Sequence, residues 1–171
     1  MSFDLHSFTV LHSAISLLFL AAGLVLLLGF AAGREWPRLG SAVIALALAT
    51  SLTGFAFPFT AFLPSHGVGI LSLLSLALVI WARYVRHLAG SARAVYRIGL
   101  TVAVYFDAFV GIVQASLKIP AVHELAPTLQ SPAFAVAQGA NVLVFVVLGV
   151  LAVRGKSASS ASGLQATTVV A

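Results

Sequence analysis

Asp107 is the residue whose type and position could do the most chemistry, because it is an acid inside a long apolar stretch. It stands ten residues after Arg97 and eleven before Lys118. At 1.5 Å per helical residue its carboxyl lies about 15 Å from either charge, near the middle of a bilayer about 30 Å thick. Because burial disfavours a carboxylate, we expect a neutral acid. Two interpretations stay open: a proton relay, or a hydrogen bond to a hydroxyl at similar depth, with Thr50, Ser51 and Ser75 as candidates.

Histidine side chains are a second candidate chemistry, because imidazoles together with a carboxylate can bind zinc, copper or haem iron. The chain has five histidines and no cysteine. No two histidines are four residues apart, so no pair is placed on one face of a helix. A haem or transition-metal site would have to gather His12, His66 and His123 from different segments. We favour ordinary positions near the membrane surface for them and assign no cofactor.

A third set of polar residues could line a pocket that opens to one side of the membrane. Gln114 stands one helical turn before Lys118, where the fourth apolar segment ends. With Thr53, Gln138 and Asn141 at similar depth, these side chains could bind an anionic or quinone-like ligand. The alternative is that Lys118 is an anchor whose ammonium group reaches the membrane surface.

The composition decides which kinds of element must position these residues. The chain has 171 residues, of which 61% are apolar and 8% charged. A soluble domain carries about 25% charged residues, so a soluble enzyme, a disordered protein and a nucleic-acid-binding domain are excluded. The sequence also lacks the motifs of familiar serine hydrolases, zinc proteases and nucleotide-binding enzymes. We therefore lean away from an enzyme.

Five apolar segments are long enough to cross a bilayer as helices. They must be helical because backbone polar groups in lipid have to be paired within the segment, and long leucine-rich runs do not alternate as barrel strands do. The sequence predicts an all-α bundle over residues 1–154 and a disordered tail over 155–171. The predicted spans are 10–32, 39–57, 67–82 (with an earlier start or an extension through Tyr84 as alternatives), 95–117 and 134–153.

Lysine and arginine are distributed unevenly between the spans. Eight of the nine fall on one side of the predicted layout, and only Lys118 falls on the other. The positive-inside rule then places the N-terminus outside and the C-terminus inside. The inner arginines are expected to contact anionic lipid headgroups. The residues on this side are Arg34, Arg38, Arg83, Arg86, Arg93, Arg97, Arg154 and Lys156.

Three motifs carry a resemblance. The chain reads TGFAFPF at 53–59, VQASLKIPA at 113–121 and APT at 126–128, followed by PAF at 132–134 and by Gln138. Over most of its length, up to about Arg154, it resembles an uncharacterised family of small bacterial multi-spanning membrane proteins. The family pattern is TGFxFPF, VQAFxKxPAL and APTxSEPPFxxAQ. The chain departs from it at Ser116, where the family has Phe, and at 130–133, where QSPA stands for SEPP.

The resemblance implies a bacterial cytoplasmic membrane and no particular activity. The family commonly has Asn where Asp107 stands, which speaks against a proton relay because an amide cannot release a proton. The leading hypothesis is a non-enzymatic protein that binds a ligand in an outward-facing polar pocket or associates with membrane components, either a second copy or another protein. The alternatives are a haem- or metal-binding redox protein and an oligomeric proton-coupled transporter.

Overall fold

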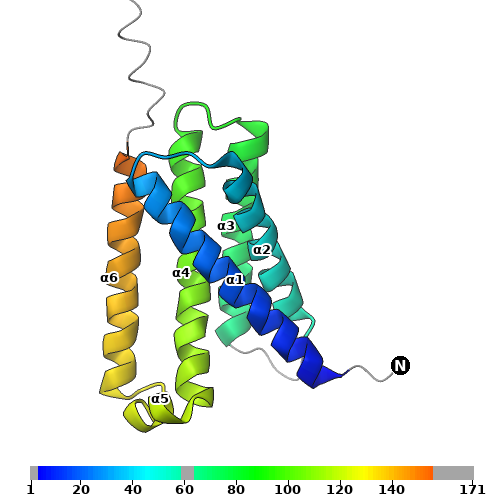
Figure 1. Ribbon diagram of the computed structural model, residues 1–171, viewed down its shortest axis with the longest axis vertical. Helices are drawn as coiled ribbons and strands as arrows, with labels where there is room; N and C mark the ends of the chain where they lie inside the picture. The colour runs from blue at the N-terminus through cyan, green and yellow to red at the C-terminus, as the bar shows by residue number, and fades with distance from the viewer. Residues whose placement is uncertain (1–3, 59–63, 156–171) are drawn as a thin grey trace, which may run out of the picture.

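The structure, a computed structural model, describes residues 4–58 and 64–155 as a bundle of helices (Figure 1). Five of its helices are long and apolar enough to cross a membrane, so the expected all-α bundle of five transmembrane helices is confirmed. The described part of the chain contains no β-strand. The elements are α1 (Leu5–Ala31), α2 (Pro37–Phe55), α3 (Pro64–Ile80), the π-helical turn η1 (Trp81–Val85), α4 (Ala92–Lys118), α5 (Pro120–Leu125) and α6 (Pro132–Arg154).

Local signals explain where the helices begin. Asp4 precedes α1, and its carboxylate accepts hydrogen bonds from the backbone N–H groups of His6 and Ser7, so α1 starts five residues before the predicted span. Proline stands at the first position of α2, α3, α5 and α6, where its missing N–H costs no hydrogen bond.

The third span extends beyond the predicted range 67–82 at both ends. It begins earlier, with α3, and continues past Ile80 through η1 to Val85, so the alternative that includes Tyr84 is confirmed. The connection after α4 contains the short helix α5. The predicted tail from residue 156 onward lies outside the described residues.

Helix α4 is the central element of the bundle. It packs against α1, α3, α5 and α6, whereas α2 packs mainly between α1 and α3. Helix α1 crosses obliquely in front of the others (Figure 1). Within the described residues α6 packs mainly against α1 and α4, so most of its surface is left for lipid.

The two ends of the bundle differ in charge. One end carries the α1–α2 and α3–α4 connections and the last turn of α6, and we call it the basic end. The opposite end carries α5 and the start of α1, and we call it the α5 end (Figure 1). Among the described residues, Lys118 is the only Lys or Arg at the α5 end, so the uneven distribution read from the sequence exists in three dimensions.

Candidate functional site

Asp107 makes a hydrogen bond that joins two helices. The Ser16 hydroxyl of α1 donates to Asp107 Oδ1 of α4 at 2.8 Å. Just toward the α5 end, Gln138 of α6 donates through Nε2 to the backbone oxygen of Phe109 at 3.1 Å. Polar contacts therefore tie α1 and α6 to α4 at nearly the same level.

The pairing of α4 with α6 brings a further amide to that level. The rings of Tyr105 and Phe145 pack edge to face with centroids 5.9 Å apart. Asn141 stands one turn from Phe145 toward the α5 end, and Asp107 stands two residues from Tyr105 in the same direction. Asn141 thus falls within about one turn of Asp107, and it is only 9% exposed.

The contact between α1 and α2 brings the hydroxyl of Thr50 to the same level. His12 Nδ1 of α1 and Thr53 Oγ1 of α2 are 2.8 Å apart. Thr50 lies about one turn from Thr53 toward the basic end, and Ser16 lies one turn from His12 in that direction. Thr50 and Ser16 are therefore level. We call the side chains at this level the polar layer: Ser16, Thr50, Asp107, Gln138 and Asn141.

Several buried hydrogen-bonding atoms of the polar layer have no partner within the described structure. Thr50 Oγ1, Asp107 Oδ2, Gln138 Oε1 and Asn141 Nδ2 are buried and have no partner among the described residues. Each unpaired buried polar atom costs about 1–3 kcal/mol. In soluble and membrane proteins alike, ordered water or a polar ligand satisfies such atoms. The layer therefore offers the amide oxygen of Gln138 as an acceptor and the amide N–H of Asn141 as a donor, together with the Thr50 hydroxyl, which can do both. Asp107 Oδ2 donates when the acid is neutral and accepts when it is ionised.

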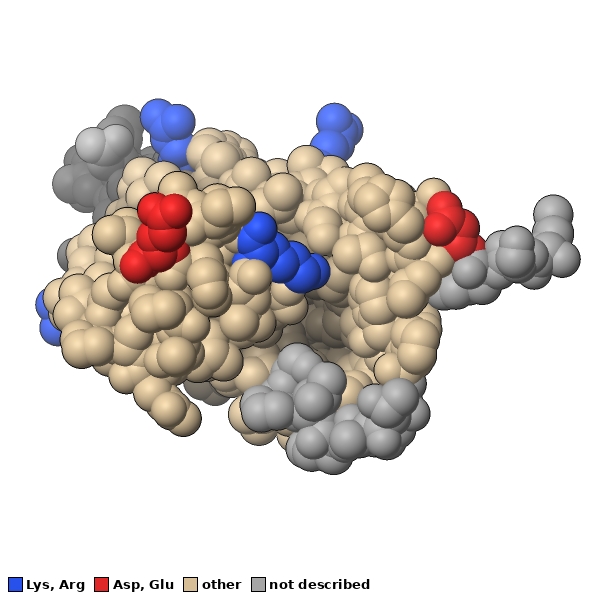
Figure 2. All heavy atoms as spheres, turned by 90° about the horizontal axis from the view of Figure 1, so that it is seen from below, with Lys and Arg blue, Asp and Glu red and all other residues tan. Residues whose placement is uncertain are grey.

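The predicted pocket residues are brought together only in part. Gln138 and Asn141 lie in the polar layer, and Thr53 lies one turn away but is bonded to His12 and to the backbone oxygen of Ala49 at 2.6 Å. Gln114 and Lys118 are exposed on the last turns of α4. Seen from the α5 end, the surface is hollowed between the helices, and a basic side chain lies at the edge of the hollow (Figure 2).

The three histidines considered as metal ligands have other contacts. His12 bonds Thr53 and packs edge to face on Phe57, and His123 Nδ1 lies 3.0 Å from the backbone oxygen of Ser116. The His66 ring lies 6.1 Å from the ring of Phe55. Within the described ranges, no three His, Asp or Glu side chains form a group that could hold a metal ion.

The hydrogen-bond partner expected for Asp107 was wrong. Ser16 takes that role, whereas Ser75 donates to the backbone oxygen of Gly99 at 2.9 Å, and Thr50 Oγ1 is unpaired. The sequence placed Ser16 toward the α5 end, but the relative height of two helices depends on how their surfaces pack. The position of a residue along its own helix was therefore not enough to predict which hydroxyl lies beside Asp107.

Arg97 has an internal role that the sequence did not indicate. Its side chain is 3% exposed, and Nη1 donates to the backbone oxygens of Ala152 and Gly155 at 2.7 and 2.8 Å. Nη2 forms an ion pair with Glu35, and the guanidinium group lies over the Phe30 ring. Arg97 thus holds the ends of α1, α4 and α6 together, and it is not available to lipid headgroups.

Arg83 ties the third span to its neighbours in a similar way. Nη2 donates to the Pro37 backbone oxygen at 2.7 Å and to the Ser41 hydroxyl at 2.9 Å, and Nη1 donates to the Tyr96 hydroxyl at 3.1 Å. A pocket of about 320 Å³ opens beside it, with Glu35 on its wall. The basic end is therefore a network of internal bonds surrounded by exposed arginines.

Two polar regions thus stand out in the bundle, the polar layer near the middle of the helices and the arginine network at the basic end. Comparison of the chain with protein-family models, with curated proteins and with solved structures finds no match. Of the two regions, only the polar layer combines several unpaired side-chain atoms from three helices.

Proposed function

We propose that the protein is a non-enzymatic integral membrane protein that binds a small, uncharged, hydrogen-bonding solute in the polar layer. The proposed setting is a bacterial cytoplasmic membrane with the N-terminus outside, which the excess of arginine at the basic end supports. The solute would enter from the α5 end, where the surface is hollowed (Figure 2). Its O–H or N–H groups would meet the free oxygens, and its own acceptor would meet the amide of Asn141.

A single observation carries this proposal: three helices direct four unpaired buried polar atoms to one level of an otherwise apolar bundle. Lipid chains cannot satisfy these atoms, and placing them together has no packing advantage over apolar side chains. A solute with both donors and acceptors would pair those on the adjoining helices α4 and α6, namely the atoms of Asp107, Gln138 and Asn141. An uncharged solute is favoured because no Lys or Arg belongs to the layer.

The natural absence of cysteine allows a sharp test. We expect Asn141→Cys to react with a charged, membrane-impermeant methanethiosulfonate reagent that is added to the N-terminal side of sealed vesicles. Two controls should stay unreactive: Val147→Cys, which faces lipid on the same helix, and Ala103→Cys, which is fully buried one turn from Asp107. Glycerol and acetamide, as uncharged probes with N–H or O–H donors, should slow the reaction of Asn141→Cys, because the unpaired oxygens of Asp107 and Gln138 remain to bind them.

The outcome that contradicts the proposal is equally clear. If neither Asn141→Cys nor Gln138→Cys reacts from either side, the polar layer is closed to water-borne solutes. Reaction that neither probe slows would show a water-filled site that does not bind this class of solute.

One observation favours a second function, proton-coupled transport. Asp107 keeps one carboxyl oxygen unpaired near mid-membrane, as a proton-carrying group would need. Proteoliposomes with an internal pH dye separate the two functions. A transporter should show a proton flux that Asp107→Asn abolishes, whereas a binding protein should show no proton flux in the wild type or in the variant.

A further inference from the structure

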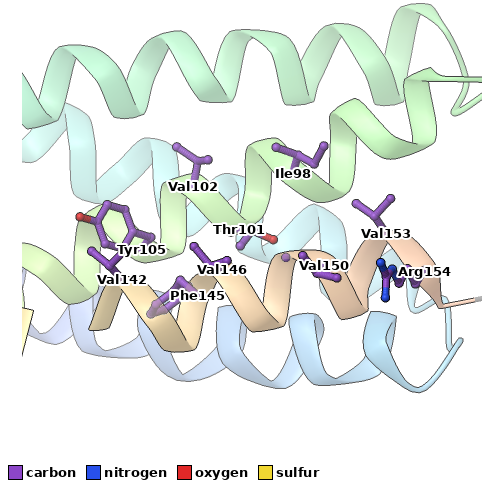
Figure 3. Close-up of a pocket in the computed structure, with 11 residues that line it drawn as sticks. Ile98, Thr101, Val102, Tyr105, Val142, Phe145, Val146, Val150, Val153 and Arg154 are labelled. Carbon is purple, nitrogen blue, oxygen red and sulfur yellow. The ribbon is translucent and has the colours of Figure 1, made fainter. Parts of the chain in front are cut away.

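A groove runs along the outside of the bundle between α4 and α6 (Figure 3). Its volume is about 510 Å³, and its walls are apolar side chains from both helices, among them Ile98, Val102, Val142, Val146 and Val150. It is separate from the arginine network, and it faces the surface that α6 leaves to lipid.

The floor of the groove is formed where the two helices approach closely. A Cβ atom at Gly149 would lie 3.3 Å from Thr101 Cγ2, so glycine lets α6 come near α4 at this point. The Thr101 hydroxyl donates to the backbone oxygen of Arg97 at 2.8 Å and therefore adds no free polar atom. The groove accordingly suits an apolar occupant along its length.

The length of the groove matches one leaflet of a bilayer. From Val142 to Val153 it follows α6 for eleven residues. At 1.5 Å per residue this is about 16 Å, which is half of a hydrocarbon core about 30 Å thick. One end lies near Tyr105 at mid-membrane, and the other lies at Arg154 on the basic end (Figure 3).

The positive charge at the Arg154 end of the groove indicates that the occupant carries a negatively charged group. Arg154 lines the groove and is exposed, and it has no ion pair among the described residues. Arg93, also exposed, lies one helical turn before Arg97 at the same end of α4. Arginine binds phosphate through paired N–H groups.

We infer that the groove holds one acyl chain of an anionic phospholipid from the leaflet at the basic end, with the headgroup phosphate bound by Arg154. The length of the groove and the arginine at its end favour an acyl chain over a helix of a second copy, because an acyl chain spans one leaflet and ends in a headgroup at the membrane surface.

The test uses purified protein reconstituted from vesicles of phosphatidylcholine and phosphatidylglycerol, followed by native mass spectrometry of what stays bound. Val146→Trp fills the groove. Val147→Trp is the matched control, because Val147 is also exposed (48% against 56%) but does not line the groove. We expect wild type and Val147→Trp to retain one phosphatidylglycerol per chain and Val146→Trp to lose it.

A second pair of variants tests the headgroup. Arg154→Gln should lower the preference for phosphatidylglycerol over phosphatidylcholine at least fivefold. Arg86→Gln, which changes an exposed arginine that stacks on Trp81 at the same end, should not. Equal lipid retention by Val146→Trp and Val147→Trp would overturn the inference. So would a lipid-free wild-type dimer that Val146→Trp dissociates, because the occupant would then be a second copy.

Discussion

At the scale of single residues, the hydrogen bond between Ser16 and Asp107 holds the acid of the polar layer in position. It fixes one carboxyl oxygen and leaves the other directed at nothing in the described structure. The Ser16 bond therefore orients the carboxyl group and leaves Oδ2 available for a hydrogen bond to a ligand.

Removing that hydroxyl should have a small but measurable cost. Hydrogen bonds between membrane helices contribute about 0.6–1.5 kcal/mol, so Ser16→Ala should lower the free energy of unfolding by that amount. Ser13→Ala, on an exposed position of the same helix, should be neutral. Unfolding in mixed detergent and dodecyl sulfate measures both. Equal values for the two variants would show that the Ser16 bond contributes nothing.

The start of α1 should respond to acid. Hydrogen bonds from the Ser7 hydroxyl, and then from the His6 backbone N–H, lower the pKa of the Asp4 carboxyl below its ordinary value of 3.8. The carboxylate therefore stabilises the first turn at pH values above the ordinary pKa, and this stabilisation is lost as the pH falls through the lowered one.

Amide hydrogen exchange at His6 and Ser7 can follow this change. Protection factors at these amides should fall between about pH 4 and pH 2 in the wild type. In Asp4→Asn, which keeps a capping oxygen but cannot titrate, they should stay constant. A wild-type profile as flat as that of the variant would contradict the prediction.

At the scale of elements, small residues decide how closely the helices approach. A Cβ atom at Gly23 of α1 would lie 2.6 Å from Val104 Cγ2 of α4, so glycine is needed where these helices cross. The π-helical turn η1 acts differently. It carries the third span on to the level at which Arg83 can bond α2 and α4.

Overpacking the crossing of α1 and α4 should destabilise the bundle. Gly23→Val should cost about 1–3 kcal/mol of unfolding free energy. Ala21→Val, on an exposed position two residues earlier, adds volume without touching α4 and should cost far less. Adding Val104→Ala to Gly23→Val should restore part of the loss. If the double variant loses the sum of the two single costs, Gly23 and Val104 are not coupled.

At the scale of the whole molecule, the arginine network joins segments that are far apart in the sequence. Arg97 links the connection after α1 to the end of α6 across α4. Because its guanidinium group is buried, each of its partners offsets the cost of removing a charge from water.

Weakening this network should lower the stability of the whole bundle. Glu35→Gln removes the charge that faces Arg97 and should cost about 1–3 kcal/mol. Glu124→Gln is the matched control, because Glu124 is exposed on α5 and has no ion pair within the described residues. Thermal unfolding in detergent compares the two. A larger loss for Glu124→Gln would show that the Arg97 network is not limiting.

The number of spans has a consequence that can be checked in cells. We expect the five candidate spans to place the two ends of the chain in different compartments. Fused to alkaline phosphatase, which is active only outside the cytoplasm, the N-terminus should give signal. Green fluorescent protein at the C-terminus should fluoresce. Reporters that place both ends on one side would contradict the five-span topology.

Much of the fold could be predicted from the sequence, because the thickness of hydrocarbon and the cost of unpaired backbone groups leave few options. The span count, the helix class and the basic end follow from apolar run lengths and arginine positions. The position of Asp107 near the middle of its helix follows as well, since it depends only on distance along that helix. Helix ends were less predictable, because Asp4 and η1 act through local hydrogen bonds rather than hydropathy.

Which side chains meet was decided only by the tertiary structure. The sequence offered Thr50, Ser51 and Ser75 for Asp107, yet Ser16 lies opposite it. From the sequence, Arg97 was also counted among the arginines that contact lipid headgroups, yet that residue is buried and forms an ion pair with Glu35. The rotation and relative height of a helix are set by the packing of its whole surface, to which glycines such as Gly23 contribute as much as polar groups do. That information is spread over many weak contacts, and no short stretch of sequence contains it.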